Sequence, residues 1–345
     1  MNRIRGLDAI RFFCAAWVML GHYSLPIPFG HEVQNPILQI LYASLHSMIS
    51  GIAAVMVFFV ISGFCIHYPY RHGEKPAWGE YFARRYIRIG LPFLAATALV
   101  HFTGGQLASL QNAVLWSLYA EMIYYGLYPL LIMFRWRFGW KALLAVAFIG
   151  AAGVVIQHSH TIFSGHGTLL NWLLGLPIWL LGARLAEDAD TLPVPKHYRL
   201  ILWRISLVVI SGICIALEFH TMFTGSITMP FFSILVYFWL RDEIGYYKVH
   251  LPFQWLEKAG AWSYSLYLMH HTAEWIVSQL TIYSDPPVIV WMMKITVAFV
   301  LSYIFYLLIE RPSHMLARLV KRKPKMEVNP PELEGGPKET ALEAR

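Results

Sequence analysis

The first apolar run of the sequence carries two ionisable side chains on one helix face. Arg11 and His22 are eleven residues apart, which in an α-helix is three turns plus about 20°, or about 16 Å along the axis. Asp8 lies three residues before Arg11 and can pair with it on that face. A guanidinium can bind an anion and an imidazole can exchange a proton. The same residues can also be explained without a catalytic or binding role. Arg11 would then be an anchor at the membrane interface, and His22 would form a hydrogen bond to a neighbouring helix.

A second apolar run, near residues 114–134, contains the carboxylate Glu121. Ser117, Tyr124 and Tyr125 share its helix face by their spacing. Because this helix is expected to enter from the outer side, Glu121 should lie at a depth close to that of His22. A carboxylate facing lipid is costly, so Glu121 either accepts a structural hydrogen bond from a tyrosine or orients a catalytic group.

A third polar face occurs in the run near residues 260–282. Ser263 and Tyr267 lie seven and three residues before His270, and therefore on the same helix face. Polar packing between membrane helices explains the serine. It explains the histidine less well, so this run also supplies candidate functional residues.

Three arginines cluster at the expected start of the run 86–103. Arg85 and Arg88 are one helical turn apart and should point together with Arg84 nearby. Guanidinium groups so placed suit bidentate contacts to phosphate. The alternative is that they are topology signals at the cytoplasmic face.

No metal site is predicted. His158 and His160 are close in sequence, but neither a carboxylate nor a cysteine accompanies them, whereas zinc sites usually have a fuller ligand set. The three cysteines, Cys14, Cys65 and Cys214, fit neither a disulfide framework nor a metal motif.

The composition indicates the kind of molecule that must position these residues. Of the 345 residues, 57% are hydrophobic and 14% charged, against about 25% charged in an ordinary soluble domain. So few charges exclude a soluble enzyme, a disordered regulator and a disulfide scaffold. The net charge of +7 does not indicate nucleic acid, because the basic residues lie between apolar runs and in the C-terminal segment.

We therefore expect an all-α, polytopic membrane bundle of about ten transmembrane helices, since each span needs about 20 apolar residues. The expected spans lie near residues 8–27, 45–67, 86–103, 114–134, 142–157, 168–184, 202–218, 226–240, 260–282 and 287–310. Pro312 is expected to end the last span. Residues 1–315 would form the membrane domain, and residues 316–345 a basic, then disordered, cytoplasmic tail.

The basic residues predict the orientation of this bundle. Lysines and arginines occupy alternate loops and both terminal segments, and the opposite loops have none; Lys294 is the exception. This bias predicts that both termini are cytoplasmic. On the residues alone, an enzyme and a proton-coupled transporter using Arg11, His22 and Glu121 as a relay both remain open. No internal repeat typical of transporters is visible.

Several motifs, in order, resemble those of the acyltransferase type 3 family, the multispan membrane O-acyltransferases that modify bacterial surface glycans and related acceptors. They extend over about residues 3–315. The motifs are Arg5-Gly6-Leu7-Asp8 with Arg11 and His22, Phe58–Phe64, Phe82 with Arg84, Arg85 and Arg88, Trp116-Ser117-Leu118 with Glu121, Ser263 with Tyr267 and His270, and Glu310-Arg311-Pro312.

The resemblance implies an acyl donor from the cytoplasm, usually acetyl-CoA, and an acceptor hydroxyl on a surface polysaccharide or glycolipid across the inner (plasma) membrane. Arg11, Arg85 and Arg88 would bind the CoA phosphates. His22 would be the base, with Glu121 as its orienting partner, or would carry a transient acyl group. Tyr267 and His270 are candidates for oxyanion or acceptor contacts. No permanently bound cofactor is expected.

The sequence departs from the family pattern in two ways, in the turn that follows Arg88-Ile89 and in the domains that it contains. The family often has proline two residues after Arg-Ile, whereas here Gly90 and Leu91 separate Arg88-Ile89 from Pro92. No extracytoplasmic hydrolase-like domain is expected, so the chain is similar to stand-alone members. An inactive relative acting in glycan assembly is a further alternative, against which the Arg11–His22 pair argues.

Overall fold

The computed structural model describes residues 4–26, 35–103, 114–281 and 286–320, and within these ranges it contains helices and no strands. In chain order, the helices are α1 (Leu7–Tyr23), α2 (Pro36–Met48), α3 (Gly51–His67), α4 (Trp78–Phe102), α6 (Trp116–Gln157), α7 (Thr168–Asp188), α8 (His197–His220), α9 (Gly225–Tyr247), α10 (Gln254–Ala259), α11 (Ser263–Leu280), α12 (Pro287–Phe305) and α13 (Arg311–Leu319).

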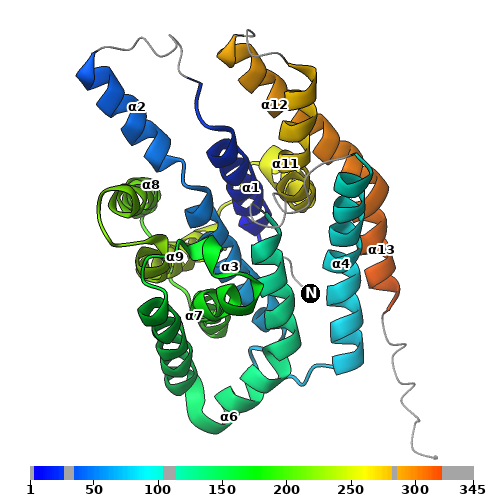
Figure 1. Ribbon diagram of the computed structural model, residues 1–345. Coiled ribbons are helices and arrows are strands. Elements are labelled where there is room, and N and C mark those ends of the chain that lie inside the picture. Colours follow the sequence, from blue (N-terminus) through cyan, green and yellow to red (C-terminus); the bar gives the residue numbers. More distant parts are fainter. Residues whose placement is uncertain (1–3, 27–34, 104–113, 282–285, 321–345) are drawn as a thin grey trace, which may run out of the picture.

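The helices are arranged around α3, which is buried over most of its length. α7 packs on α3 and also on α6, while α1 lies between α3 and α11. α11 packs on α12, and α13 runs beside α4 (Figure 1). This arrangement places α1, α4 and α11, which carry most of the predicted site residues, around one part of the bundle, with α13 beside them.

Helices α3 and α7 approach each other closely because each has a glycine at the contact. A Cβ atom at Gly63 would lie 1.9 Å from the carbonyl oxygen of Trp179, and one at Gly182 would lie 1.8 Å from that of Val60. Small residues that let two backbones approach are a common device between membrane helices. The backbones of α3 and α7 are therefore in close contact near the centre of the bundle.

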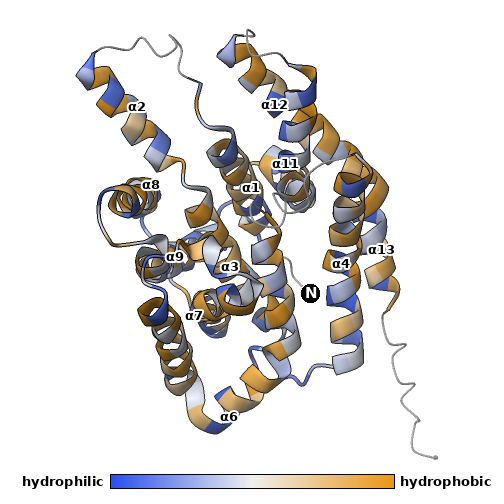
Figure 2. Ribbon diagram, viewed as in Figure 1, coloured by the Kyte–Doolittle hydropathy of each residue, from blue (hydrophilic) through white to orange (hydrophobic). Residues whose placement is uncertain are grey.

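Hydrophobic residues occur on all sides of the helices (Figure 2). Large apolar side chains such as Ile149, Ile156 and Leu202 are more than half exposed, which suits contact with lipid and not with water. By length and composition, five helical segments in the described part of the chain can cross a membrane: Pro36–Tyr70, Trp116–Gln157, Thr168–Asp188, His197–His220 and Pro287–Leu319. The total of ten spans and the cytoplasmic position of both termini remain predictions.

Each predicted span coincides with helix, but several boundaries differ. The structure adds α2, which begins in the predicted outer loop 28–44 and continues into the predicted span 45–67; the Asn35 side chain caps its first turn by accepting from the Ile37 amide at 2.9 Å. The spans predicted at 114–134 and 142–157 join into α6, which bends at Gly139, whose φ is +83°. The arginine cluster lies inside α4, not at its start, because α4 begins at Trp78.

The prediction that the last span ends at Pro312 is wrong. A π-helical turn, Tyr306–Glu310, connects α12 to α13, and the helix continues to Leu319. Proline is tolerated there because it occupies the first turn of α13, where its missing amide hydrogen is not needed. The described part of the predicted tail, residues 316–320, is thus largely helical, and residues 321–345 lie outside the described residues.

Candidate active site

Helix α1 carries the two residues that the sequence singled out first. Because α1 is continuous from Leu7 to Tyr23, Arg11 and His22 lie about 16 Å apart along its axis. The predicted pairing of Arg11 with Asp8 is confirmed, with Nη1 of Arg11 donating to Oδ1 of Asp8 at 3.2 Å. Nη2 of Arg11 also donates to Sγ of Cys65 on α3 at 3.2 Å. These contacts hold the guanidinium of Arg11 between α1 and α3.

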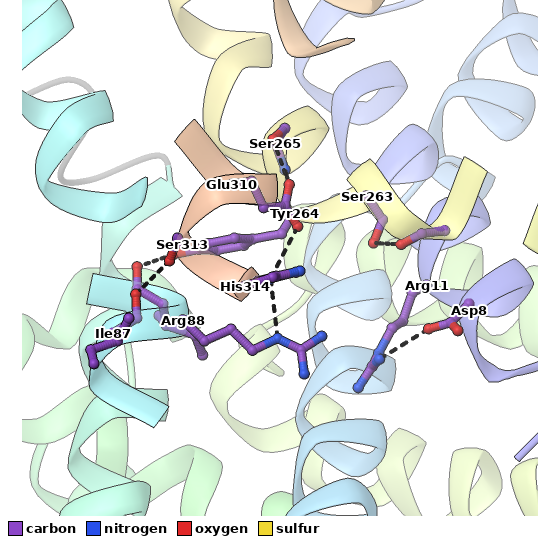
Figure 3. Close-up of polar contacts among 12 residues, drawn as sticks. Asp8, Arg11, Ile87, Arg88, Ser263, Tyr264, Ser265, Glu310, Ser313 and His314 are labelled. Atoms are coloured by element: carbon purple, nitrogen blue, oxygen red, sulfur yellow. Dashed lines mark hydrogen bonds and ion pairs between the residues drawn. The ribbon is translucent and has the colours of Figure 1, made fainter. Parts of the chain in front are cut away.

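The predicted arginine set comes together at this end of α1. Arg11 and Arg88 extend toward each other from α1 and α4 (Figure 3), and the positive charges of Arg11 and Arg85 both act on Arg88. Nε of Arg88 donates to Nε2 of His314 at 3.1 Å. Within the described residues, neither Arg85 nor Arg88 forms an ion pair with a carboxylate. Two further positive charges next to Arg88 favour an anionic ligand at this position.

Helix α13 fixes the position of α4 and therefore of Arg88. The Ser313 hydroxyl donates to the backbone oxygen of Ile87 at 2.6 Å. Glu310, which is buried, accepts from both the backbone N and the Oγ of Ser265 on α11, at 3.0 and 2.5 Å (Figure 3). Glu310 thus links the last helices to α11 and has a structural role.

At the opposite end of α1, His22 lies against His270 of α11, with ring centroids 5.0 Å apart. His270 is fully buried, and its Nδ1 lies 3.3 Å from the carbonyl oxygen of Leu266. The Tyr23 hydroxyl donates to the backbone oxygen of His270 at 2.5 Å. Nε2 of His270 is buried and has no hydrogen-bond partner among the described residues. The structure therefore brings the two predicted histidines together, and one of them has a free ring nitrogen.

Tyr267 lies one turn before His270, with their ring centroids 6.0 Å apart. Its hydroxyl is 2.7 Å from Oγ of Ser117 on α6 and also donates to the backbone oxygen of Val114 at 3.2 Å. Ser117, Tyr267 and His270 are therefore neighbours, a contact between two helices that spacing within one helix did not predict. The hydroxyl of Tyr267 is oriented by α6.

The expected pairing of Glu121 with His22 is not formed. Oε1 of Glu121 accepts from Oγ of Ser62 at 2.5 Å and from the hydroxyl of Tyr125. Trp179 of α7 donates to the same Ser62 oxygen at 3.2 Å. The charge of Glu121 also acts on Arg11. Glu121 therefore belongs to the arginine end of the site, because the packing of α6 against α3 and α7 brings it to Ser62.

Sequence reasoning missed three residues that contact the site. His314 accepts from Arg88, and only its position one turn after Glu310 could have indicated this contact. Glu274 and Lys294 form an ion pair at 2.8 Å beside the histidines. A signal for this pair existed, because Lys294 is the basic residue that breaks the loop pattern and Glu274 lies one turn after His270.

Other polar groups lie away from this site. A cavity of about 450 Å³ is located at the α6 bend, lined by Gly139, Lys141 and Glu187 among others and by none of the predicted site residues. His158 contacts His166, with ring centroids 5.9 Å apart. Across the described ranges, no three histidine, cysteine, aspartate or glutamate side chains are placed to hold a metal ion.

Comparison with protein families agrees with this site. The acyltransferase domain family, acyltransferase type 3, matches residues 4–310. That range includes both the arginine cluster and the histidine pair. The comparisons with curated proteins and with solved structures gave no significant match. Because the family match extends over most of the chain, this protein belongs to the acyltransferase type 3 family of membrane acyltransferases.

Proposed function

We propose that this protein is an O-acyltransferase of the cell inner membrane that moves an acyl group, most simply acetyl, from cytoplasmic acyl-CoA to a hydroxyl of an extracytoplasmic surface polysaccharide or glycolipid. The observation that carries the proposal is the distribution of groups along α1. Arg11, Arg85 and Arg88 gather at one end, and His22 and His270 meet at the other. A long donor with phosphates at one end and a thioester at the other suits this separation.

The arginine end supplies binding energy for the phosphates of the donor. Charge-assisted hydrogen bonds from guanidinium groups to phosphate are about twice as strong as neutral ones and can be bidentate. The repulsion between Arg88 and its cationic neighbours would be relieved by the anion. Acetyl-CoA acts here as a substrate and leaves as CoA.

The histidine end supplies the proton transfer. In the proposed step, the acceptor oxygen attacks the thioester carbonyl carbon while His22 takes the hydroxyl proton. The new C–O bond forms and the C–S bond breaks, and the proton passes from His22 to the departing thiolate. We assign Tyr267 a contact with the oxyanion or the acceptor, and His270, whose Nε2 can accept a hydrogen bond, a contact with the acceptor hydroxyl. A transient acyl group on His22, released to the acceptor in a second step, is the other route open to this residue.

Purified full-length protein in liposomes tests the proposal. We expect label to move from acetyl-CoA, radiolabelled in the acetyl group, to a glycan and glycolipid fraction extracted from the envelope of cells that lack this chain. Release of the CoA thiol should match the label transferred, and protein-free liposomes should show neither. Parallel assays with acyl-CoA donors of longer acyl chains would show which acyl length the protein transfers. Movement of the acceptor across the membrane without acylation would overturn the proposal and favour a transporter.

A further inference from the structure

A partly buried ion pair lies beside the proposed base. Nζ of Lys294 on α12 donates to Oε1 of Glu274 on α11 at 2.8 Å, and the two side chains are only 21% and 26% exposed. Charges inside a membrane protein are costly and usually serve a function. The mechanism outlined above does not use this pair.

Three helices bring the ion pair and His22 into one cluster. Glu274 follows His270 and His271 by about one helical turn, and the nearest carboxylate oxygen lies 3.8 Å from Nδ1 of His271. Nζ of Lys294 stands 5.8 Å from the ring centroid of Tyr23, the residue after His22. Within this cluster the charge of Glu274 acts on His22.

From this geometry we infer that Glu274 is a positioning residue for the base, and that Lys294 sets the strength of its effect. The inference rests on the proposed function. When His22 takes the hydroxyl proton, its ring becomes positively charged, and the negative charge of Glu274 stabilises that form. Lys294 opposes this effect, because its charge has the opposite sign. Glu274 thereby takes the place that the sequence suggested for Glu121.

Few other titratable groups face His22 among the described residues. His270 and His271 approach from α11, and Tyr23 belongs to α1 itself. α3 approaches this end of α1 near Gly21 through the backbone of Ile49 and Gly51, which adds no charge. Among these described neighbours of His22, Glu274 and Lys294 are therefore the carboxylate and the amine of the cluster.

Two substitutions that remove charges of opposite sign test the inference. Glu274→Gln keeps an oxygen that accepts from Lys294 but removes the negative charge, and Lys294→Gln keeps a donor to Glu274 but removes the positive charge. The first should make the His22 imidazolium lose its proton at lower pH, and the second at higher pH. For unit charges in a partly polar site, we expect shifts of roughly half to one pH unit.

Diethyl pyrocarbonate gives a readout that needs no acceptor, because it modifies neutral imidazole. We would measure its rate of reaction as a function of pH, by mass spectrometry of the peptide that contains His22. Glu218→Gln is the matched control, since that carboxylate on α8 accepts from the backbone N of Gly225 at 2.8 Å. Glu274→Asp should largely restore the profile of the original protein.

Opposite shifts in the two variants, repeated in the acid limb of the pH–rate profile of acyl transfer, support the inference. Shifts of the same sign, or none, overturn it and leave the ion pair as a structural link between α11 and α12. Failure of the proposed function looks different, because acyl transfer would then be absent from the original protein or would survive loss of His22.

Discussion

The imidazole rings of His22 and His270 lie 5.0 Å apart between centroids, although one belongs to α1 and the other to α11. Tyr23 fixes this relationship through its hydrogen bond to the backbone oxygen of His270. Because Nδ1 of His270 lies near the carbonyl oxygen of Leu266, its proton belongs on that nitrogen. Nε2 is then a buried acceptor without a partner in the part of the chain that the structure describes, which is a cost to folding that function can explain.

Replacing His270 with leucine should separate stability from activity. A buried polar group without a hydrogen bond costs about 1–3 kcal/mol, so His270→Leu should keep or raise the melting temperature in detergent. Acyl transfer should fall about tenfold or more, since a polar group next to the base is lost. Thermal unfolding followed by intrinsic fluorescence, together with the transfer assay, checks both. A lower melting temperature with unchanged transfer would assign His270 a structural role.

The arginine cluster predicts the affinity for the donor. The double variant Arg85→Ala, Arg88→Ala should bind CoA about 100-fold more weakly, because each hydrogen bond to a charged group contributes about 1.5–3 kcal/mol. Equilibrium binding of radiolabelled acetyl-CoA to the purified protein measures this, and the dependence of binding on salt should also become weaker. Arg137→Ala is the matched control, since Arg137 is an exposed arginine on α6. Unchanged affinity would leave Arg85 and Arg88 as topology signals.

The contact between α3 and α7 should not accept a methyl group. Gly182→Ala would place a carbon 1.8 Å from the Val60 oxygen, so the two helices must move apart and the protein should aggregate or unfold at a much lower temperature. Gly150→Ala is the control, because nothing lies within 4 Å of that position and alanine favours helix. Size-exclusion chromatography and thermal unfolding compare the two variants. Similar behaviour of both would contradict the close packing described here.

An ion pair in the loop after α7 predicts a dependence of stability on pH. Arg71 donates to both carboxylate oxygens of Asp190, at 2.7 and 3.1 Å, and this contact lowers the pKa of Asp190. A lowered carboxyl pKa stabilises the fold above the ordinary aspartate range, and that contribution is lost as the pH falls through the lowered value.

Asp190→Asn should therefore lower the melting temperature slightly at pH 7, since exposed pairs contribute about 0–1 kcal/mol. The difference from the original protein should shrink as the pH falls below the ordinary aspartate range and vanish at still lower pH. Melting temperatures measured across this range check the prediction. A difference that stays constant with pH would mean that the ion pair contributes nothing.

The sequence predicted the parts of the fold that depend on local pattern. Apolar runs located the helices, and the three-residue spacing located the Asp8–Arg11 pair. It missed α2, because its signals are the Asn35 cap and Pro36 at the first turn and not a run of 20 apolar residues. It also placed the helix end at Pro312, where the π-helical turn lets the chain continue.

Contacts between helices were harder to predict, because spacing within one helix does not say which neighbour its face meets. Glu121 shows this most clearly. Its depth suggested His22, but packing of α6 against α3 gives it Ser62 and Tyr125. Lys294 and Glu274 meet for the same reason, through the packing of α12 on α11. The sequence identified His22 and His270 as separate candidate residues but did not predict that their rings lie against each other.

The most direct test of the account replaces His22. His22→Ala should still bind CoA and unfold at a similar temperature, because the histidine is half-buried at the end of α1 and the arginines lie about 16 Å away. Transfer of radiolabelled acetyl groups from acetyl-CoA should fall about 100-fold or more, while His101→Ala, an exposed histidine at the end of α4, should transfer as the original does. Transfer by His22→Ala within a few fold of the original would contradict the proposed mechanism.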